Sequence, residues 1–252
     1  MRTSVVIPAT NGNFGYVNCI LRHYEDGKIR PDEVVVSISN AHLLDSQKID
    51  DLENRFKDAF ELKVLRHNRK MIQGPNRDAG TSATTGDIIL SNDADDIPHP
   101  QRVEIVLGLF ERHDIVHLNH GYQKYDEHEF ETVTRIESIA GDQLLRHHFP
   151  NHERVSGEEK RPNPQDLGFA APYGGDLKWQ IHAGCPIFRK DVFEEIKWRH
   201  TEQVAWDYDF CMDVLYRFNK SMIINTSLIW YNLLHTRRDE ADLENLGKLY
   251  KE

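Results

Sequence analysis

The chain has 252 residues, enough for one large α/β domain or two small ones. Hydrophobic residues make up 39% and charged residues 29%, as in an ordinary soluble globular protein. The net charge of −10, with no compensating basic stripe, argues against a nucleic-acid partner. Three scattered cysteines show no metal or redox spacing, and no segment has the apolar length of a membrane span. The expected location is therefore the cytoplasm, with peripheral membrane contact left open.

The first half of the chain predicts alternating strands and helices. Short apolar and β-branched runs predict strands over residues 4–8, 33–38, 62–65 and 88–90. Helical spacing of apolar residues predicts helices over residues 16–24, 46–60, 76–85 and 101–113. Repeated strand–helix units indicate a mostly parallel central sheet with helices on both faces.

The second half of the chain is less regular. Residues 116–136 predict long, irregular strands, and residues 151–176 predict a functional loop, a lid rather than a domain linker. Helices are expected at residues 192–196 and 207–218, strands at 222–224 and 228–231, and a surface helix at 237–252.

A cluster of carboxylates follows the apolar run Ile88–Leu90: Asp93, Asp95 and Asp96. Carboxylates are costly to bury unless they are paired or bind a metal. Ligands of open α/β sheets also bind beyond the carboxyl ends of the strands. The cluster therefore predicts a divalent metal site that faces a phosphorylated ligand.

This cluster has two other interpretations. An EF-hand loop is excluded, because Ile97 and Pro98 stand where a further ligand and then a glycine are needed. A solvated turn that caps the helix beginning near Pro100 stays open.

Four motifs occur in a fixed order: Val5–Asn11, Gly74–Gly80, Asp93–Asp96 and Trp206–Phe210. This series resembles the inverting GT-A glycosyltransferases of the family-2 type, from residue 4 to about residue 235. Those proteins have a Val-Ile-Pro-Thr-Tyr-Asn-like strand, an Ala-Arg-Asn-x-Gly-like helix start, an Asp-x-Asp motif and a late helix with an aspartate. The resemblance implies a single GT-A (Rossmann-like) domain over residues 1–252. Its nucleotide-sugar half covers about 1–118 and its acceptor half about 119–236, followed by the tail 237–252.

The resemblance also implies a metal-dependent transfer of sugar from a nucleoside diphosphate sugar to an acceptor hydroxyl. Asp95 would coordinate Mn²⁺ or Mg²⁺, and Asp93 would share the metal or contact the ribose. Arg77 would stabilise the diphosphate, with a surface ion pair as the alternative. His235 would reach the metal, although an ordinary surface or core histidine stays open. The remaining donor contacts are expected from Pro8, Ala9, Thr10, Asn11, Ser39 and Ala94.

The resemblance implies uracil as the base of the nucleotide-sugar donor, but one feature of the chain departs from the family here. Related enzymes place acidic residues after the second strand, where this chain has Ile38, Ser39 and Asn40. GDP- and dTDP-sugars therefore stay open. The acceptor is expected to be a glycan, a lipid-linked sugar, a protein or a small molecule. His182 and Trp179 would line its pocket or belong to the core.

Asp207 is the expected general base for an inverting transfer, by the same resemblance. Trp206 precedes it, where related enzymes often carry a glutamate. Asp209 is a competing base, and a helix N-terminal charge is the structural alternative for Asp207. A retaining mechanism also stays open.

Two other functions are alternatives to sugar transfer. A sugar nucleotidyltransferase would need a glycine-rich, basic loop after the first strand, and residues 10–13 lack a lysine or arginine. A non-catalytic module that binds sugar nucleotides or glycans could dispense with a base, so the presence of Asp207 argues mildly against it.

Overall fold

The computed structural model describes residues 1–124, 130–148, 179, 186–198 and 206–231. The strands are β1 Thr3–Thr10, β2 Glu33–Ser39, β3 Glu61–His67, β4 Ile88–Ser91, β5 Ile97–Pro98, β6 His117–Lys124, β7 Ser138–Ala140, β8 Ile187–Arg189 and β9 Ser221–Tyr231. The helices are α1 Phe14–Glu25, η1 Ala41–Leu43, α2 Ser46–Phe56, α3 Gln73–Ser82, α4 Arg102–Arg112, α5 Gly141–His148, α6 Lys190–Glu195 and α7 Trp206–Phe218. Within these ranges no helix is long and apolar enough to cross a membrane.

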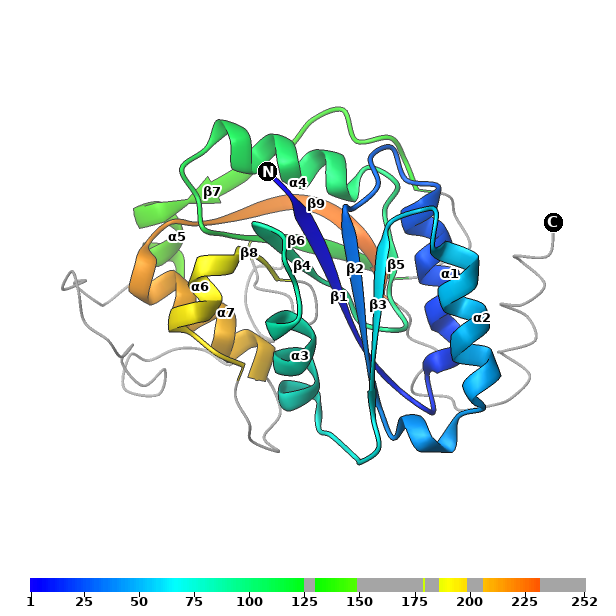
Figure 1. Cartoon of the computed structure of the whole chain (residues 1–252). Coiled ribbons are helices and arrows are strands. Elements are labelled where there is room, and N and C mark those ends of the chain that lie inside the picture. Colours follow the sequence, from blue (N-terminus) through cyan, green and yellow to red (C-terminus); the bar gives the residue numbers. More distant parts are fainter. Residues whose placement is uncertain (125–129, 149–178, 180–185, 199–205, 232–252) are drawn as a thin grey trace.

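One mixed sheet joins all nine described strands (Figure 1). Its order is β3-β2-β1-β4-β8-β6-β9-β5, and β7 pairs with β9. The strands β3, β2, β1 and β4 are parallel, whereas β8 runs antiparallel to both β4 and β6. The chain moves outward from β1 to β3 and then returns to β4 on the other side of β1. The carboxyl ends of β1 and β4 therefore flank the topological switch point, where open α/β sheets bind ligands.

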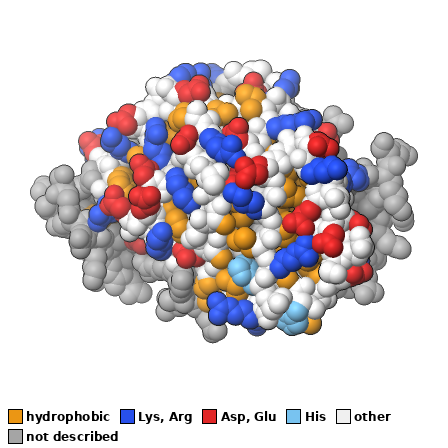
Figure 2. Space-filling view, in the orientation of Figure 1, with side chains coloured by type: hydrophobic (Ala, Val, Ile, Leu, Met, Phe, Trp, Pro, Cys, Tyr) orange, Lys and Arg blue, Asp and Glu red, His pale blue; other side chains and the backbone are white. Residues whose placement is uncertain are grey.

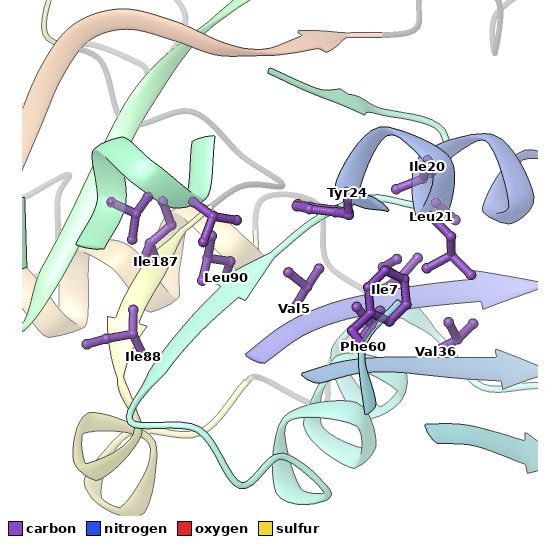
Figure 3. Close-up of a cluster of buried hydrophobic side chains, with 14 of the residues drawn as sticks. Val5, Ile7, Ile20, Leu21, Tyr24, Val36, Phe60, Ile88, Leu90 and Ile187 are labelled. Atoms are coloured by element: carbon purple, nitrogen blue, oxygen red, sulfur yellow. The ribbon is translucent and has the colours of Figure 1, made fainter. Parts of the chain in front are cut away.

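Helices cover both faces of the sheet and enclose two apolar cores. The first core lies under α1, α2 and α4, and Figure 3 shows Val5 and Ile7 of β1 facing Ile20, Leu21 and Tyr24 of α1. The second core lies under α5, α6 and α7 and takes Val6 and Ile89 from the same strands. Successive strand residues point to opposite faces, so two covered faces require the uninterrupted apolar runs seen in the sequence.

The helix α3 lies unusually close to β1, and two glycines explain this approach. A Cβ on Gly80 would lie 2.7 Å from Cγ1 of Val6, and a Cβ on Gly86 would lie 2.8 Å from the backbone nitrogen of Ser4. The predicted helix over residues 76–85 is displaced: α3 begins at Gln73 and ends at Ser82, so Gly86 lies beyond it. Gly86 allows the connection to β4 to pass against the β1 backbone.

The outer strand β3 is protected by charge. Lys63 pairs with Glu33 at 2.5 Å, and Arg66 pairs with Asp50 and Glu53 of α2. Charged side chains on an edge strand discourage pairing with another chain. On the side of the molecule seen in Figure 2, basic and acidic side chains are interspersed rather than separated.

The second half differs most from expectation. The two strands predicted at 222–224 and 228–231 are one strand, β9, whose pairing with β6 shifts register around Gly121. The irregular strands predicted to residue 136 end at Lys124 where they are described, and residues 130–137 form no strand. The short elements β5, β7, β8 and α5 were not predicted. The segments 151–176 and 237–252 lie outside the described residues.

Candidate functional site

The end of β1 forms one wall of the switch point. Pro8 and Ala9 are buried within the strand, Thr10 is its last residue, and Asn11 is exposed just beyond it. The backbone N–H of Thr10 donates to Oδ1 of Asn13 at 2.6 Å, which closes the turn into α1. The backbone N–H of Asn11 donates to the carbonyl of Ser39 at 3.2 Å, which ties the ends of β1 and β2 together.

The hydroxyl of Ser39 orders the segment that precedes α3. It accepts the backbone N–H of Met71 at 2.7 Å, and Ser39 is only 1% exposed. Asn40, next in the chain, has a left-handed backbone (φ 57°) and donates its N–H to the carbonyl of Arg69 at 3.0 Å. The carboxyl ends of β2 and β3 are thereby fixed relative to each other.

Arg77 projects from α3 into the interior and is fully buried. Its guanidinium donates to Oγ of Ser91 and to Oδ1 of Asp93, and it lies 5.5 Å from the ring centroid of Trp198. The predicted alternative of a surface ion pair is wrong about location, because this ion pair joins α3 to the end of β4 in the interior. A buried guanidinium needs such a partner, since an unpaired buried charge is very costly.

Asp93 lies between the interior and the solvent. Its side chain is 20% exposed, so part of the carboxylate group remains reachable from the solvent while the group contacts Arg77. Burial raises the pKa of the Asp93 carboxyl, and the positive charge of Arg77 opposes that shift.

The Asp93–Asp96 turn is held by Asn92. The side-chain amide of Asn92 donates to the carbonyls of Asp93 at 2.7 Å and Asp96 at 2.8 Å. The backbone N–H of Asp96 also donates to the carbonyl of Asp93 at 3.1 Å. Within this closed turn Ala94 and Asp96 are buried, and Asp95 is partly exposed.

The hypothesis of a solvated helix cap is wrong for this turn. Asp96 is 1% exposed, and α4 begins only after Gln101. Nδ1 of His99, rather than a carboxylate, accepts the backbone N–H of Gln101 at 2.9 Å.

A buried polar network behind the turn was missed by sequence reasoning. Arg102 is fully buried and donates to the Tyr24 hydroxyl at 2.6 Å, to Oδ1 of Asn92 at 2.7 Å and to the Ser91 carbonyl at 2.8 Å. The Tyr24 hydroxyl donates in turn to Oδ1 of Asn92 at 2.8 Å. The signal in the sequence was the position of Arg102, which stands beside the inward-facing apolar residues of α4. This network fixes the amide that holds the turn.

The strand β9, the last described strand, runs toward the Asp93–Asp96 turn. β5 follows the Asp93–Asp96 turn and pairs antiparallel with β9, with Ile97 opposite Trp230. The exposed rings of Tyr122 and Tyr231 lie 5.3 Å apart at this end of β6 and β9. His235 and His182 lie outside the described residues.

The helix α7 carries Asp207 and packs on the second core through its later residues. Asp207 is the second residue of α7, whose side chains are described from Asp209 onward. Further along α7, Phe210, Val214 and Leu215 are buried. Trp179 is partly buried and packs against the second core, as its core interpretation expects.

The described residues contain no group of three or more His, Cys, Asp or Glu side chains placed to hold a metal ion. The partly exposed Asp93 and Asp95 nevertheless offer the carboxylate oxygens that Mn²⁺ and Mg²⁺ prefer. The donor set thus fits a hard divalent ion that takes further ligands from water, from a phosphate or from the rest of the chain.

Solved structures of similar fold include a mannosyltransferase and a glucosyl-3-phosphoglycerate synthase. S. aureus TarS 1-349 in complex with UDP-GlcNAc matches with a TM-score of 0.63 and 14% identity, covering 97% of this chain and 61% of that one. Glucosyl-3-phosphoglycerate synthase from Mycobacterium tuberculosis, in complex with Mn²⁺, UDP and glucosyl-3-phosphoglycerate, matches with a TM-score of 0.56 and 15% identity, covering 98% of this chain and 75% of that one. The mannosyltransferase PcManGT from Pyrobaculum calidifontis, in complex with GDP-Man and Mn²⁺, matches with a TM-score of 0.54 and 13% identity, covering 88% of this chain and 56% of that one.

The fold is therefore that of the GT-A glycosyltransferases, as the motifs predicted. The sequence also matches the family model of Glycosyl transferase family 2 over residues 4–197, and the chain belongs to that family. It spans about three-fifths of the TarS chain it matches, 61% of its length. No curated protein matches the sequence.

Proposed function

We propose that the chain transfers a sugar from a nucleoside diphosphate sugar to an acceptor hydroxyl, with the help of a divalent metal ion. The observation that carries this proposal is the position of the Asp93–Asp96 turn. It lies at the carboxyl end of β4, beside β1, and is held by Asn92 and paired with Arg77. The bound UDP-GlcNAc, UDP and GDP-Man named for the similar structures support a donor of this class.

In this proposal Asp95 binds the metal, Mn²⁺ or Mg²⁺, and Asp93 shares it or contacts the ribose. The metal supplies Lewis-acid stabilisation of the diphosphate leaving group. Arg77 acts on the same site through Asp93, because its guanidinium is buried against that carboxylate. β9 runs toward the turn, which supports His235 as a further metal ligand.

The nucleoside part of the donor lies along the carboxyl ends of β1 and β2. The backbone of Thr10 and Asn11 faces this edge, and Ser39 is tied to both neighbouring segments. The residues proposed to contact the donor here are Pro8, Ala9, Thr10, Asn11, Ser39 and Ala94. UDP-sugar is the weakly favoured donor.

Asp207 is the proposed general base. It removes the proton of the acceptor hydroxyl while the sugar is attacked opposite the leaving diphosphate, which inverts the anomeric carbon. Its position in the first turn of α7, the helix with its buried face in the second core, is consistent with an acceptor half over about 119–236 in a single domain. Asp209 is the competing base. The acceptor class and a cytoplasmic location, with or without peripheral membrane contact, belong to the same proposal.

Nucleotide release from UDP-, GDP- and dTDP-sugars tests the function. Release from one donor with Mn²⁺ is expected, with loss in EDTA and in Asp95→Ala. The variant Asp207→Ala is expected to lose about 10²- to 10⁴-fold in transfer rate. Binding of a donor without release in any condition would favour a non-catalytic module. Formation of pyrophosphate from a nucleoside triphosphate would favour a nucleotidyltransferase.

A further inference from the structure

A chain of hydrogen bonds links the core of the sheet to His67, the last residue of β3. The amide nitrogen of Asn76 donates to the carbonyl of Ala9 at 2.9 Å. The hydroxyl of Ser37 donates to Oδ1 of Asn76 at 2.7 Å. Oγ of Ser37 also lies 3.0 Å from Nε2 of His67.

The proton positions in this chain are forced by what each atom is able to do. The Ala9 carbonyl only accepts, so the Asn76 side chain turns its NH₂ group to it and its Oδ1 to Ser37. Oδ1 also only accepts, so the single hydroxyl proton of Ser37 points at Asn76. Nε2 of His67 must therefore be the donor to Ser37.

The imidazole of His67 is thus fixed in one tautomer. Burial, together with the positive charge of Arg69, lowers the pKa of His67, which favours the neutral ring. A neutral ring with its proton on Nε2 carries a lone pair on Nδ1. Within the described residues no hydrogen bond is made to Nδ1, and the ring is only partly buried. His67 therefore presents one oriented acceptor.

This acceptor lies on the ligand-binding edge of the sheet. His67 is opposite Ser39 in the parallel pairing of β2 and β3. It is three strand positions from β4, which corresponds to about 14 Å at 4.8 Å per position. The strand on the other side of β4 is antiparallel. From the Asp93–Asp96 turn at the end of β4, the uninterrupted row of carboxyl ends therefore extends toward β1, β2 and β3.

We propose that Nδ1 of His67 accepts the ring N–H of the donor's nucleobase. The donor then carries uracil, thymine or guanine, each of which has a ring N–H on its pairing edge. Adenine and cytosine carry a lone pair at the corresponding ring nitrogen, which would face the lone pair of Nδ1. His67 is accordingly a specificity-determining residue, and this assignment rests on the proposed nucleotide-sugar function.

The test is calorimetric binding of UDP, dTDP, GDP, CDP and ADP to the full chain with Mn²⁺. One of the first three is expected to bind at least about tenfold more tightly than CDP and ADP. The variant His67→Ala should reduce this ratio to within about threefold, and Ser37→Ala should reduce it in part, because the ring is then free to change tautomer. His67→Asn, which keeps an acceptor near Nδ1, should retain more discrimination than His67→Ala.

The matched control is His113→Ala, at an exposed histidine that follows α4. It should keep the wild-type ratio, and thermal unfolding should show every variant folded. Equal binding of all five nucleotides, or an unchanged ratio in His67→Ala, would overturn the role of His67 and leave the donor proposal standing. Failure of all five to bind would overturn the proposed function and this role with it.

Discussion

Arg77 and Asp93 form an ion pair that joins the interior of the molecule to its candidate site. The guanidinium is fully buried in α3, whereas the carboxylate is 20% exposed at the end of β4. The pair therefore connects a packed helix to a reachable acid. Any change in the packing of α3 is transmitted to the position of Asp93.

Replacement of Arg77 by methionine should be strongly destabilising. Asp93 would lose its charge partner, and loss of one member of a buried pair costs about 3 kcal/mol or more in free energy of unfolding. Urea unfolding measures this loss. The control is Arg66→Met, whose partners Asp50 and Glu53 are exposed, so the expected loss is below about 1 kcal/mol. Equal losses in the two variants would contradict the structural role of Arg77.

The same helix allows a test of close packing. Gly80→Ala places a Cβ 2.7 Å from Cγ1 of Val6, and overpacking of this kind costs about 1–3 kcal/mol. Thermal unfolding should show the loss, and Gly80→Ala should cost less in a Val6→Ala background than in the wild type.

Gly15→Ala is the matched control for this substitution. Gly15 lies in α1, where an added Cβ meets nothing within 4 Å. Alanine should stabilise this helix position by about 0.5–1 kcal/mol. A loss of stability at Gly15 equal to that at Gly80 would show that contact with Val6 is not the cause.

Replacement of Asn92 by serine should weaken metal binding and also destabilise the fold, because Oδ1 of Asn92 accepts from the buried Arg102. The amide of Asn92 holds two carbonyls of the Asp93–Asp96 turn, and serine is too short to reach both. Outer contacts that orient metal ligands are typically worth about 10- to 100-fold in affinity. The Mn²⁺ concentration for half-maximal nucleotide release should rise by about tenfold. Asn225→Ser, at an exposed position of β9, should leave it unchanged.

Acid should destabilise the fold through His117. Burial lowers the pKa of this histidine to about 3, from an unfolded value of 6.5. Between these values the unfolded chain binds the extra proton, so the free energy of unfolding falls as the pH falls below 6.5. The expected contribution is about 2 kcal/mol at pH 5.

Urea unfolding at several pH values checks this dependence. His117→Asn, which retains a polar group near Ser221, should flatten the profile relative to wild type. The exposed His113→Asn should leave the profile unchanged. Parallel profiles for wild type and His117→Asn would rule out His117 as the titrating group.

The sequence was sufficient for the elements whose pattern is local. The strands at 4–8, 33–38 and 88–90 were predicted because both faces of β1, β2 and β4 are covered, which requires continuous apolar runs. The location of Asp93, Asp95 and Asp96 just beyond a buried strand was predicted from the apolar run that precedes them, and the metal site expected there stays a prediction.

Contacts between distant residues were beyond such reasoning. Tyr24 and Arg102 meet Asn92 across separations of 68 and 10 residues, and nothing in the local sequence marks them as partners. The interior position of Arg77 likewise depends on Asp93, which is 16 residues away. The polar stretch of β9 at residues 225–227 resembled a break between two strands, because it interrupts the apolar pattern.

The pairing of β5 with β9 makes the molecule indivisible. A fragment that ended at residue 118 would leave β5 without its described partner and would uncover the edge of β4 now paired with β8. It would also remove Ile187, Met222 and Leu228 from the first core. An unpaired buried edge is prone to aggregate. We therefore propose that the two halves unfold as one cooperative unit, and that neither is a module that could be exchanged between enzymes by simple fusion.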